Sequence, residues 1–157
     1  MSKLLEECEI PNKRLSRKTQ NQYTKETNEG IYEWIVSNCK EVPDENNIFK
    51  CWIPETDTKG FDYMEDKNQF RFSLRGKKVL VHVFVKRCFE DNQDNLDVSH
   101  LCHNRKCCRP SHLAYEDRSY NKSRDGCSGY IIDKNNALLV CKHKPSCKVT
   151  STIVSSC

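Results

Sequence analysis

The spacing of apolar residues predicts a helix in the first third of the chain. Ile31, Trp34 and Ile35 recur at helical intervals, and polar residues lie off that face, so we expect a short amphipathic helix over residues 28–40. The polar residues 43–47, which begin with Pro43, break this pattern and are expected to form a loop.

A second pattern, typical of β-structure, begins near Phe70. Apolar and polar residues alternate over Arg71–Arg75, which predicts a strand, and Gly76–Lys78 can turn the chain back. The run Val79–Val85 is apolar and rich in β-branched residues. Such a run fits a buried strand, but it also fits a helix packed in the core, and the pattern leaves both open.

The composition indicates one domain with a thin hydrophobic core. The chain has 157 residues, of which 36% are hydrophobic and 31% are charged, so the fold needs a further source of stability. Eleven cysteines could provide it. We expect a polar arm over residues 1–30 and one domain over residues 31–157. The basic cluster Lys13–Lys18 favours a solvated arm over a DNA-contacting arm or a nuclear import signal.

The cysteines are expected to be reduced and available to bind metal. The chain turns acidic within its first residues, without a secretory signal, and no apolar run is long enough to span a bilayer. We therefore expect a nuclear or cytoplasmic protein, not a secreted or membrane-bound one, with reduced thiols. The odd number of cysteines also argues against a complete disulfide framework. The net charge of +4 fits a polyanionic partner without requiring one.

Cysteine and histidine residues gather at metal-ligand spacing between residues 98 and 147. The later group in this stretch is a complete set of three cysteines and one histidine, which suits a closed, structural zinc site. The earlier group supplies three ligands, and Cys51 is our choice for the fourth. Zinc contributes about 10 kcal/mol of folding free energy per site in model fingers, which a thin core lacks. The two expected ligand sets are Cys51, Cys102, Cys107 and His112, and Cys127, Cys141, His143 and Cys147.

Several cysteines and histidines remain outside the two ligand sets. His100 and His103 flank Cys102, and on an extended strand His100 shares a face with Cys102 while His103 points away. A histidine in such a position is more often structural than catalytic, and periodicity does not decide its role. The cysteines left over are interpreted as packing or surface residues: Cys8, Cys39, Cys88, Cys108 and Cys157.

Three runs in the same region resemble the His-Cys box homing endonucleases. They are Val98–Cys107, Pro110–Leu113 and Asn121–Arg124. The resemblance is strong over residues 98–147 and faint over residues 51–89. It implies an α+β fold of the ββα-metal kind, with an antiparallel sheet and two structural zinc ions.

The resemblance also implies where the catalytic residues lie. His100 would end the first strand of the ββα unit, residues 112–116 would form the second strand, and residues 117–124 would form the helix. This helix would present Asn121 toward His100. In this family the histidine is the general base, and the asparagine holds one catalytic Mg²⁺ in each active site.

Double-stranded DNA is the partner that the resemblance implies. An arginine on a preceding strand contacts the scissile phosphate in this family; Arg71 matches it best, with Arg75 as the alternative. An antiparallel sheet reads the major groove, here around Lys67–Arg75. Four further basic residues could neutralise phosphates, although a solvated face explains them equally well. They are Lys77, Lys78, Lys86 and Arg87.

Two departures from the family affect these predictions. The gap between Cys127 and Cys141 is longer than in the family's best-known member, so the second zinc loop carries an insertion. The sequence ends ten residues after Cys147, where that relative has a longer tail that is exchanged between subunits. A homodimer and a monomer therefore both stay open.

The predicted function is a metal-dependent DNA endonuclease of the homing type, which hydrolyses phosphodiester bonds. A nicking or low-specificity nuclease of the same metal type is a close variant of it. The alternative from another class is a zinc-stabilised DNA-binding module without cleavage activity. Such a module is expected to lose His100 or Asn121 while it keeps its zinc ligands. Both residues are present, which favours an enzyme.

Overall fold

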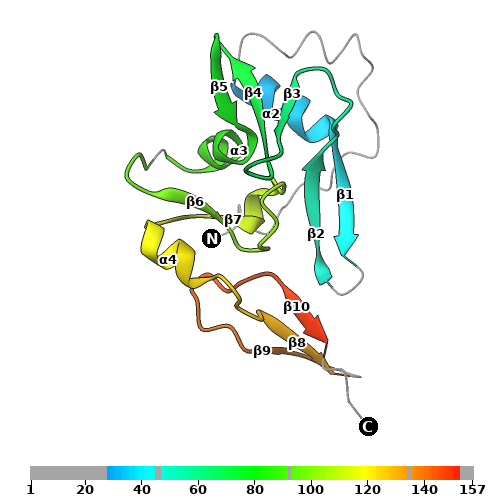
Figure 1. Ribbon diagram of the computed structural model, residues 1–157, viewed down its shortest axis with the longest axis vertical. Helices are drawn as coiled ribbons and strands as arrows, with labels where there is room; N and C mark the ends of the chain where they lie inside the picture. The colour runs from blue at the N-terminus through cyan, green and yellow to red at the C-terminus, as the bar shows by residue number, and fades with distance from the viewer. Residues whose placement is uncertain (1–27, 45–46, 92, 134–135, 153–157) are drawn as a thin grey trace.

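The computed structural model describes residues 28–44, 47–91, 93–133 and 136–152. Figure 1 shows two parts stacked along the long axis: a larger upper part that holds α2, α3 and the first strands, and a small lower sheet. Helix α4 lies between them. Residues 1–27 of the predicted polar arm, which include its basic cluster, lie outside the described residues.

Helix α2 spans Asn28–Ser37 and buries the apolar face that the spacing predicted, with Ile31 and Ile35 inside the core. It ends before the predicted boundary at residue 40. The Asn38 side chain donates from Nδ2 to the carbonyl oxygen of Trp34 (2.8 Å) and so occupies a carbonyl of the last turn. The following residue already belongs to a strand.

A two-stranded hairpin follows the helix. Strand β1 (Cys39–Asp44) pairs antiparallel with β2 (Asn47–Pro54), and Val42 lies opposite Cys51. The loop predicted over residues 43–47 is therefore wrong at both ends, since residues 43 and 44 belong to β1 and residue 47 opens β2. The ladder tolerates Pro43 because the register shifts there. Backbone pairing rather than hydrophobicity defines these strand ends.

A three-stranded antiparallel sheet contains the strand predicted from the alternating pattern. Phe70 and Phe72 of its middle strand are buried, while Arg71 lies on the opposite face. Arg75 and Gly76 have φ values of 49° and 77°, which is the geometry of a tight two-residue hairpin turn. The strands are β3 (Phe61–Met64), β4 (Gln69–Leu74) and β5 (Lys77–Leu80).

The apolar run over residues 79–85 divides between two elements. Leu80 ends β5, and α3 (Val81–Phe89) begins at the next residue. The strand and the helix that the pattern left open are therefore each right for part of the run. Val81, Phe84 and Val85 are buried in the core, where α3 contacts α2, β4 and β5.

The next elements form the ββα unit that the resemblance implied. Strands β6 and β7 are antiparallel, with His100 opposite Leu113. His112 lies in a short 3-10 turn, η1 (Pro110–His112), just before β7. Asp117 caps α4, because its Oδ1 accepts the backbone N–H of Tyr120 at 2.8 Å. The three elements are β6 (Asp97–His100), β7 (Leu113–Glu116) and α4 (Arg118–Ser123).

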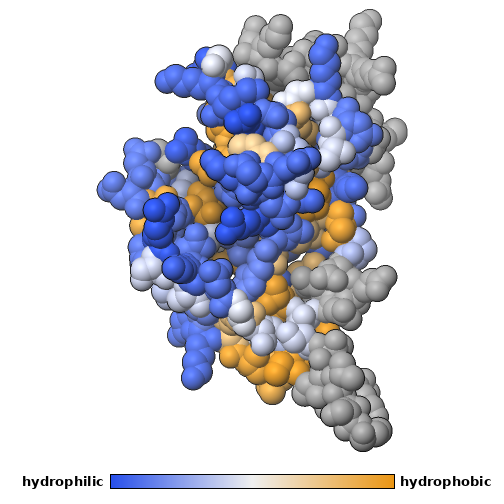
Figure 2. Space-filling view, in the orientation of Figure 1, coloured by the Kyte–Doolittle hydropathy of each residue, from blue (hydrophilic) through white to orange (hydrophobic). Residues whose placement is uncertain are grey.

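The lower sheet has the strand order β10, β8, β9, and β10 runs parallel to β8. Its β8–β9 hairpin lies between Cys127 and Cys141. Figure 2 shows an apolar patch at this end of the molecule, where Leu138 is 65% exposed and Leu139 is 48% exposed. The strands are β8 (Tyr130–Asp133), β9 (Asn136–Leu139) and β10 (Thr150–Thr152).

Helices and mainly antiparallel strands confirm the predicted α+β class. Within the described ranges, none of the helices combines the length and apolar character needed to cross a membrane.

Candidate functional site

The first candidate metal site joins two distant parts of the chain. Cys51 of β2 meets Cys102 and Cys107 from the loop after β6 and His112 from η1. Their four ligand atoms lie within 4.8 Å of one another, and all four residues are buried. The His112 Nδ1 atom lies 3.7 Å from Cys51 Sγ and 3.5 Å from Cys107 Sγ. The structure thus brings together the first predicted ligand set, including Cys51, which lies outside the segment 98–147.

The second candidate metal site lies in the loops below α4. Cys127, Cys141, His143 and Cys147 place their ligand atoms within 4.8 Å of one another. His143 Nδ1 lies 3.3 Å from Cys141 Sγ and 3.7 Å from Cys147 Sγ. Between Cys127 and Cys141 the chain forms the β8–β9 hairpin, so the long gap does not separate the ligands.

Both clusters have the dimensions of a tetrahedral zinc site. Bonds of about 2.3 Å to sulfur and about 2.0–2.1 Å to nitrogen give a tetrahedron whose edges measure roughly 3.5–3.8 Å. The sulfur-to-nitrogen separations of 3.3–3.7 Å are close to these edges. Each cluster offers four side-chain ligands, which leaves no position for a substrate. The residues therefore fit two structural zinc ions.

Electrostatics in the first cluster also favours a cation. Hydrogen bonds from the Cys107 and Cys51 thiols hold the pKa of Cys102 well below its ordinary value. The hydrogen bond with Cys102 raises the pKa of Cys51 to about 12, and burial together with Cys102 raises that of Cys107. One negative charge is thus shared among three thiols. A divalent cation allows all three to ionise.

The outer contacts of His143 orient its ring for the second cluster. Ser123 Oγ donates to the Tyr120 carbonyl oxygen (2.6 Å) and lies 3.2 Å from His143 Nε2. The serine oxygen can then accept the Nε2–H, which leaves the Nδ1 lone pair facing the thiols. Burial opposes ionisation of Cys141, but hydrogen bonds from Cys147 and His143 outweigh it and lower its pKa to about 6.

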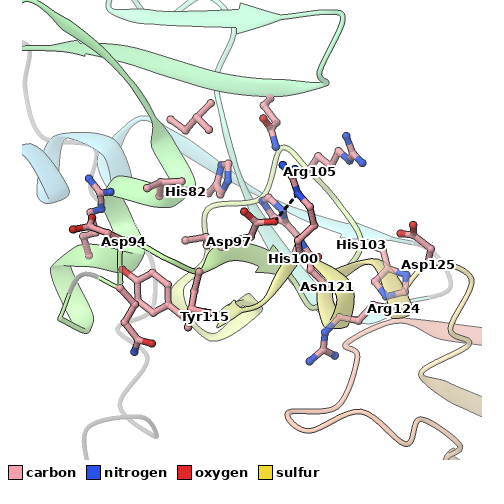
Figure 3. A pocket seen from close by; sticks show the side chains of 18 of the residues that line it. His82, Asp94, Asp97, His100, His103, Arg105, Tyr115, Asn121, Arg124 and Asp125 are labelled. Atoms are coloured by element: carbon pink, nitrogen blue, oxygen red, sulfur yellow. Dashed lines mark ion pairs between the residues drawn. The ribbon is translucent and has the colours of Figure 1, made fainter.

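A cleft of about 680 Å³ opens beside the ββα unit (Figure 3). His100 at the end of β6 and Asn121 on α4 both line it, so the structure brings these two predicted residues into one space. Sequence reasoning missed other members of the cleft, because they come from several elements, namely α3, β6, β7, α4 with the residue after it, and the loop between two zinc ligands. They include His82, Asp97, Arg105, Tyr115, Arg118 and Arg124.

His100 has the environment of a neutral base. Its Nε2 lies 3.1 Å from the carbonyl oxygen of Cys107. When Nε2 carries the proton and donates it to this carbonyl, Nδ1 keeps its lone pair. Burial lowers the pKa of His100 to about 4, and that of His82 is also held well below its ordinary value by burial. The two rings pack with centroids 4.4 Å apart, which fixes the plane of the His100 imidazole.

Asn121 offers an amide to the cleft. Its backbone is occupied within α4, where its N–H donates to the Asp117 carbonyl oxygen (2.9 Å). Among the residues that the structure describes, no hydrogen bond occupies its half-buried side chain. A neutral amide oxygen of this kind suits Mg²⁺, which keeps several waters and takes few protein ligands.

The arginine predicted from the resemblance lies outside the lining of the cleft. Arg71 Nε donates to Asp62 Oδ2 at 2.6 Å, and neither Arg71 nor Arg75 lines the cleft. Gln69, two residues earlier on the same face of β4, does line it, so Arg71 lies at its border. Contact between Arg71 and the scissile phosphate stays a prediction. Arg105 lines the cleft itself, and its charge contributes to the low pKa of His100.

The structure corrects one of the candidate phosphate contacts. The Lys86 side chain is 7% exposed and its Nζ lies 2.5 Å from Glu90 Oε1, so Lys86 is a buried ion-pair partner, because α3 turns that position inward. Lys77, Lys78 and Arg87 are exposed.

The leftover cysteines within the described residues are packing or surface residues, as interpreted. Cys39 and Cys108 are buried with their Sγ atoms 3.4 Å apart, and Cys88 is exposed. Cys8 and Cys157 lie outside the described residues.

Comparison with known families gives a match to a family model that covers more than half of the chain. The model of the zinc-binding loop region of homing endonucleases matches residues 50–156, which include both metal clusters and the ββα unit. No curated protein matches the chain.

Proposed function

Because the chain belongs to the homing endonuclease zinc-binding loop family, we propose that it is a metal-dependent DNA endonuclease that hydrolyses phosphodiester bonds. The observation that carries this proposal is the pairing of His100 and Asn121 in one cleft, with the Nε2 atom of His100 bonded to a backbone carbonyl. A DNA-binding module needs the zinc sites for its fold, but DNA binding alone does not require His100 and Asn121 in one cleft.

His100 acts as the general base. Its Nδ1 accepts a proton from a water molecule, the water oxygen forms a bond to phosphorus, and the bond from phosphorus to the 3′-oxygen breaks. The Cys107 carbonyl holds the imidazole in the tautomer that this step requires. Because burial keeps the ring neutral, the base form is already dominant at neutral pH.

Asn121 would hold Mg²⁺ through its side-chain oxygen, and one protein ligand suits an ion that takes few of them. When bound, Mg²⁺ stabilises the leaving 3′-oxygen and the added negative charge on phosphorus. Arg105, from inside the cleft, contacts the scissile phosphate, and Arg71 approaches it from the cleft border.

The two zinc ions keep the catalytic unit folded. The first ties β2 to the loop between β6 and β7, and that loop supplies the carbonyl that orients His100. The second ties the segment after α4 to the loop at residues 141–147. DNA lies across the exposed basic side chains of the β3–β4–β5 sheet, including Lys77 and Lys78.

The alternative, a zinc-stabilised DNA-binding module, differs from this proposal in one assay. Zinc-loaded protein is incubated with supercoiled plasmid with and without Mg²⁺, and binding is followed on the same DNA. The proposal expects nicked or linear DNA only when Mg²⁺ is present. Tight binding without cleavage at any Mg²⁺ concentration would support the module instead.

A further inference from the structure

Helix α4 needs outside support to hold Asn121 in place. It has six residues, and isolated helices much longer than this are marginal in water. None of its residues is buried, so the hydrophobic core does not anchor it. The position of Asn121 therefore depends on polar contacts from neighbouring segments.

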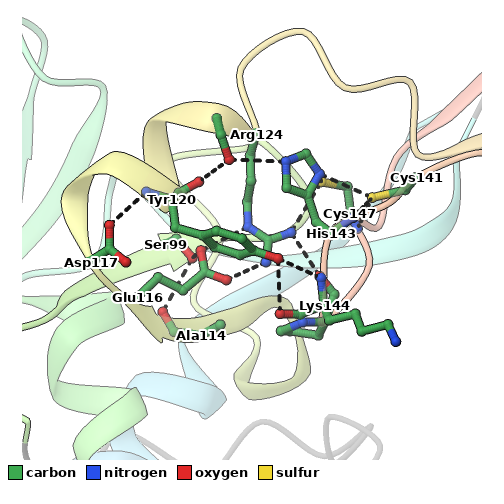
Figure 4. Close-up of polar contacts among 12 residues, drawn as sticks. Ser99, Ala114, Glu116, Asp117, Tyr120, Arg124, Cys141, His143, Lys144 and Cys147 are labelled. Atoms are coloured by element: carbon green, nitrogen blue, oxygen red, sulfur yellow. Dashed lines mark hydrogen bonds and ion pairs between the residues drawn. The ribbon is translucent and has the colours of Figure 1, made fainter.

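The loop that carries the second metal cluster supplies several of these contacts (Figure 4). Tyr120 Oη accepts the backbone N–H of Lys144 at 2.8 Å, and its ring packs edge-on against His143 at 5.6 Å. Ser123 Oγ lies 3.2 Å from Nε2 of the same histidine. The two residues flank Asn121 in the helix, so the helix is held against the ligand loop on both sides of it.

Arg124, just after α4, makes the strongest connection. Its side chain is 2% exposed. Its Nη1 donates to Cys147 Sγ (3.3 Å) and to the Pro145 carbonyl oxygen (2.9 Å). Its Nε donates to Glu116 Oε2 (2.8 Å), and its Nη2 donates to Glu116 Oε1. One guanidinium thus spans a ligand of the second cluster and the end of β7.

The connection continues to the strand that carries the base. Ser99 Oγ donates to Glu116 Oε2 at 2.6 Å, and Ser99 is fully buried next to His100 in β6. A chain of hydrogen bonds therefore runs from the Cys147 sulfur through Arg124 and Glu116 to Ser99. Every side chain in it is buried, so loss of one partner leaves the others unsatisfied.

We propose that Arg124 is a positioning residue through which occupancy of the second Cys3His cluster sets the geometry of the cleft. With metal bound, the Cys147 thiolate and the ordered loop fix the guanidinium, which in turn fixes Glu116, β6 and the end of α4. Without metal, the loop no longer holds Tyr120, Ser123 and Arg124, and His100 and Asn121 lose their relative placement. This inference rests on the proposed nuclease function for its catalytic consequence but not for its structural one.

The structural part is tested by zinc release from the holoprotein to a chromogenic chelator. Arg124→Lys keeps the charge, but one ammonium cannot serve Glu116, Pro145 and Cys147 together. We expect one of the two zinc ions to leave about 10–100-fold faster, the usual cost of losing an outer partner of a metal ligand, while the other is unaffected. Lys86→Met removes a different buried cation and is expected to change neither rate. Unchanged release in Arg124→Lys would overturn the proposal.

The coupling to the cleft is tested by a double-mutant cycle. Cys141→Ser weakens the second cluster without touching an Arg124 contact. Hydrogen exchange of the β6 amides and Mg²⁺-dependent cleavage are measured for wild type, Cys141→Ser, Arg124→Lys and the double variant. We expect each single variant to lose β6 protection and about 10-fold or more in cleavage rate, and the double variant to lose little more than either one.

The outcomes separate this inference from the proposed function. Additive losses in the cycle would mean that the cluster and the cleft are independent, which overturns the coupling. If wild type cleaves no DNA, the exchange and zinc-release measurements still decide the coupling alone. If Arg124→Lys does not fold, Arg124→Met with Glu116→Leu removes both buried charges at once and enters the same cycle.

Discussion

His100 shows how much of a proposed catalytic residue can be predicted from sequence. The run over residues 99–104 identified it through a family resemblance. The spacing of cysteines and histidines predicted the second metal ligand set and three members of the first, and Cys51 was chosen as the fourth. The hydrogen bond between His100 and the Cys107 carbonyl could not be predicted, since it depends on the backbone path of a loop. Arg105 was missed for the same reason, because its spacing from the zinc ligands does not indicate which side of the loop faces the cleft.

Asn121 is expected to determine the Mg²⁺ requirement. In Asn121→Ala the amide oxygen is lost, and the cleavage rate at fixed Mg²⁺ should fall on the order of 10²-fold or more. Asn121→Asp, which offers a charged oxygen, should reach half-maximal rate at a lower Mg²⁺ concentration. Rates are measured over a Mg²⁺ titration, with Asn95→Ala, an exposed asparagine outside the cleft, as the matched control. An Asn121→Ala enzyme with a normal titration curve would exclude this role.

Arg105 and Arg71 are expected to differ in their effect on cleavage. Arg105 lines the cleft, whereas Arg71 is already bonded to Asp62. Arg105→Ala should therefore slow single-turnover cleavage by about 10²-fold, with a smaller loss in Arg71→Ala. The reverse order would show that DNA draws Arg71 away from Asp62 and that the family's arginine acts here from β4.

At the scale of elements, the structure departs from the predictions where hydrophobicity carries little information. The alternation in residues 71–75 located β4, because one of its faces is buried. The two ends of β1 and the first residue of β2 were misread as the end of a helix and a loop, because backbone pairing between strands cannot be read from hydropathy. The run 79–85 is apolar on both sides of the boundary at Leu80, so periodicity alone could not place that boundary.

Helix α3 places His82 where acid should destabilise the fold. Its pKa is lowered by burial and then by the charge of His100. The unfolded chain therefore binds a proton near pH 6.5 that the folded chain does not accept, and stability falls as pH drops below about 6.5. Between about pH 6.5 and about pH 5.5 this contributes a loss of about 1 kcal/mol.

The prediction is checked by urea unfolding of zinc-loaded wild type and His82→Leu at both pH values. Acid also affects the zinc ligands, but equally in both proteins, so the difference between them isolates residue 82. Wild type should lose about 1 kcal/mol more than the variant. Equal losses would mean that His82 accepts a proton in the folded state.

At the scale of the whole molecule, the two metal clusters replace part of a hydrophobic core. The first joins β2 to the ββα unit and the second joins that unit to the lower sheet. Structural zinc contributes about 10 kcal/mol or more of folding free energy in small domains, which is comparable with the total stability of about 5–15 kcal/mol of a typical protein. The fold should therefore depend on zinc more than on any single apolar contact.

Removal of zinc is expected to unfold the chain. A chelator should abolish the far-ultraviolet circular dichroism signal of the fold, and Zn²⁺, but not Mg²⁺, should restore it. Cys51→Ser should lower the thermal midpoint strongly, whereas Cys88→Ser, at an exposed cysteine outside both clusters, should leave it within a few degrees. A metal-free chain with native circular dichroism would contradict a structural role for the ions.

The central claim is that His100 is the base of a Mg²⁺-dependent DNA endonuclease. The most direct measurement uses a randomised duplex DNA library, with sequencing of the new ends made by zinc-loaded wild type and His100→Ala, each with and without Mg²⁺. We predict new ends from wild type with Mg²⁺ alone, and about 10²–10⁴-fold fewer from His100→Ala with unchanged zinc content. Equal numbers of ends from both proteins, or DNA binding by wild type without new ends, would contradict it.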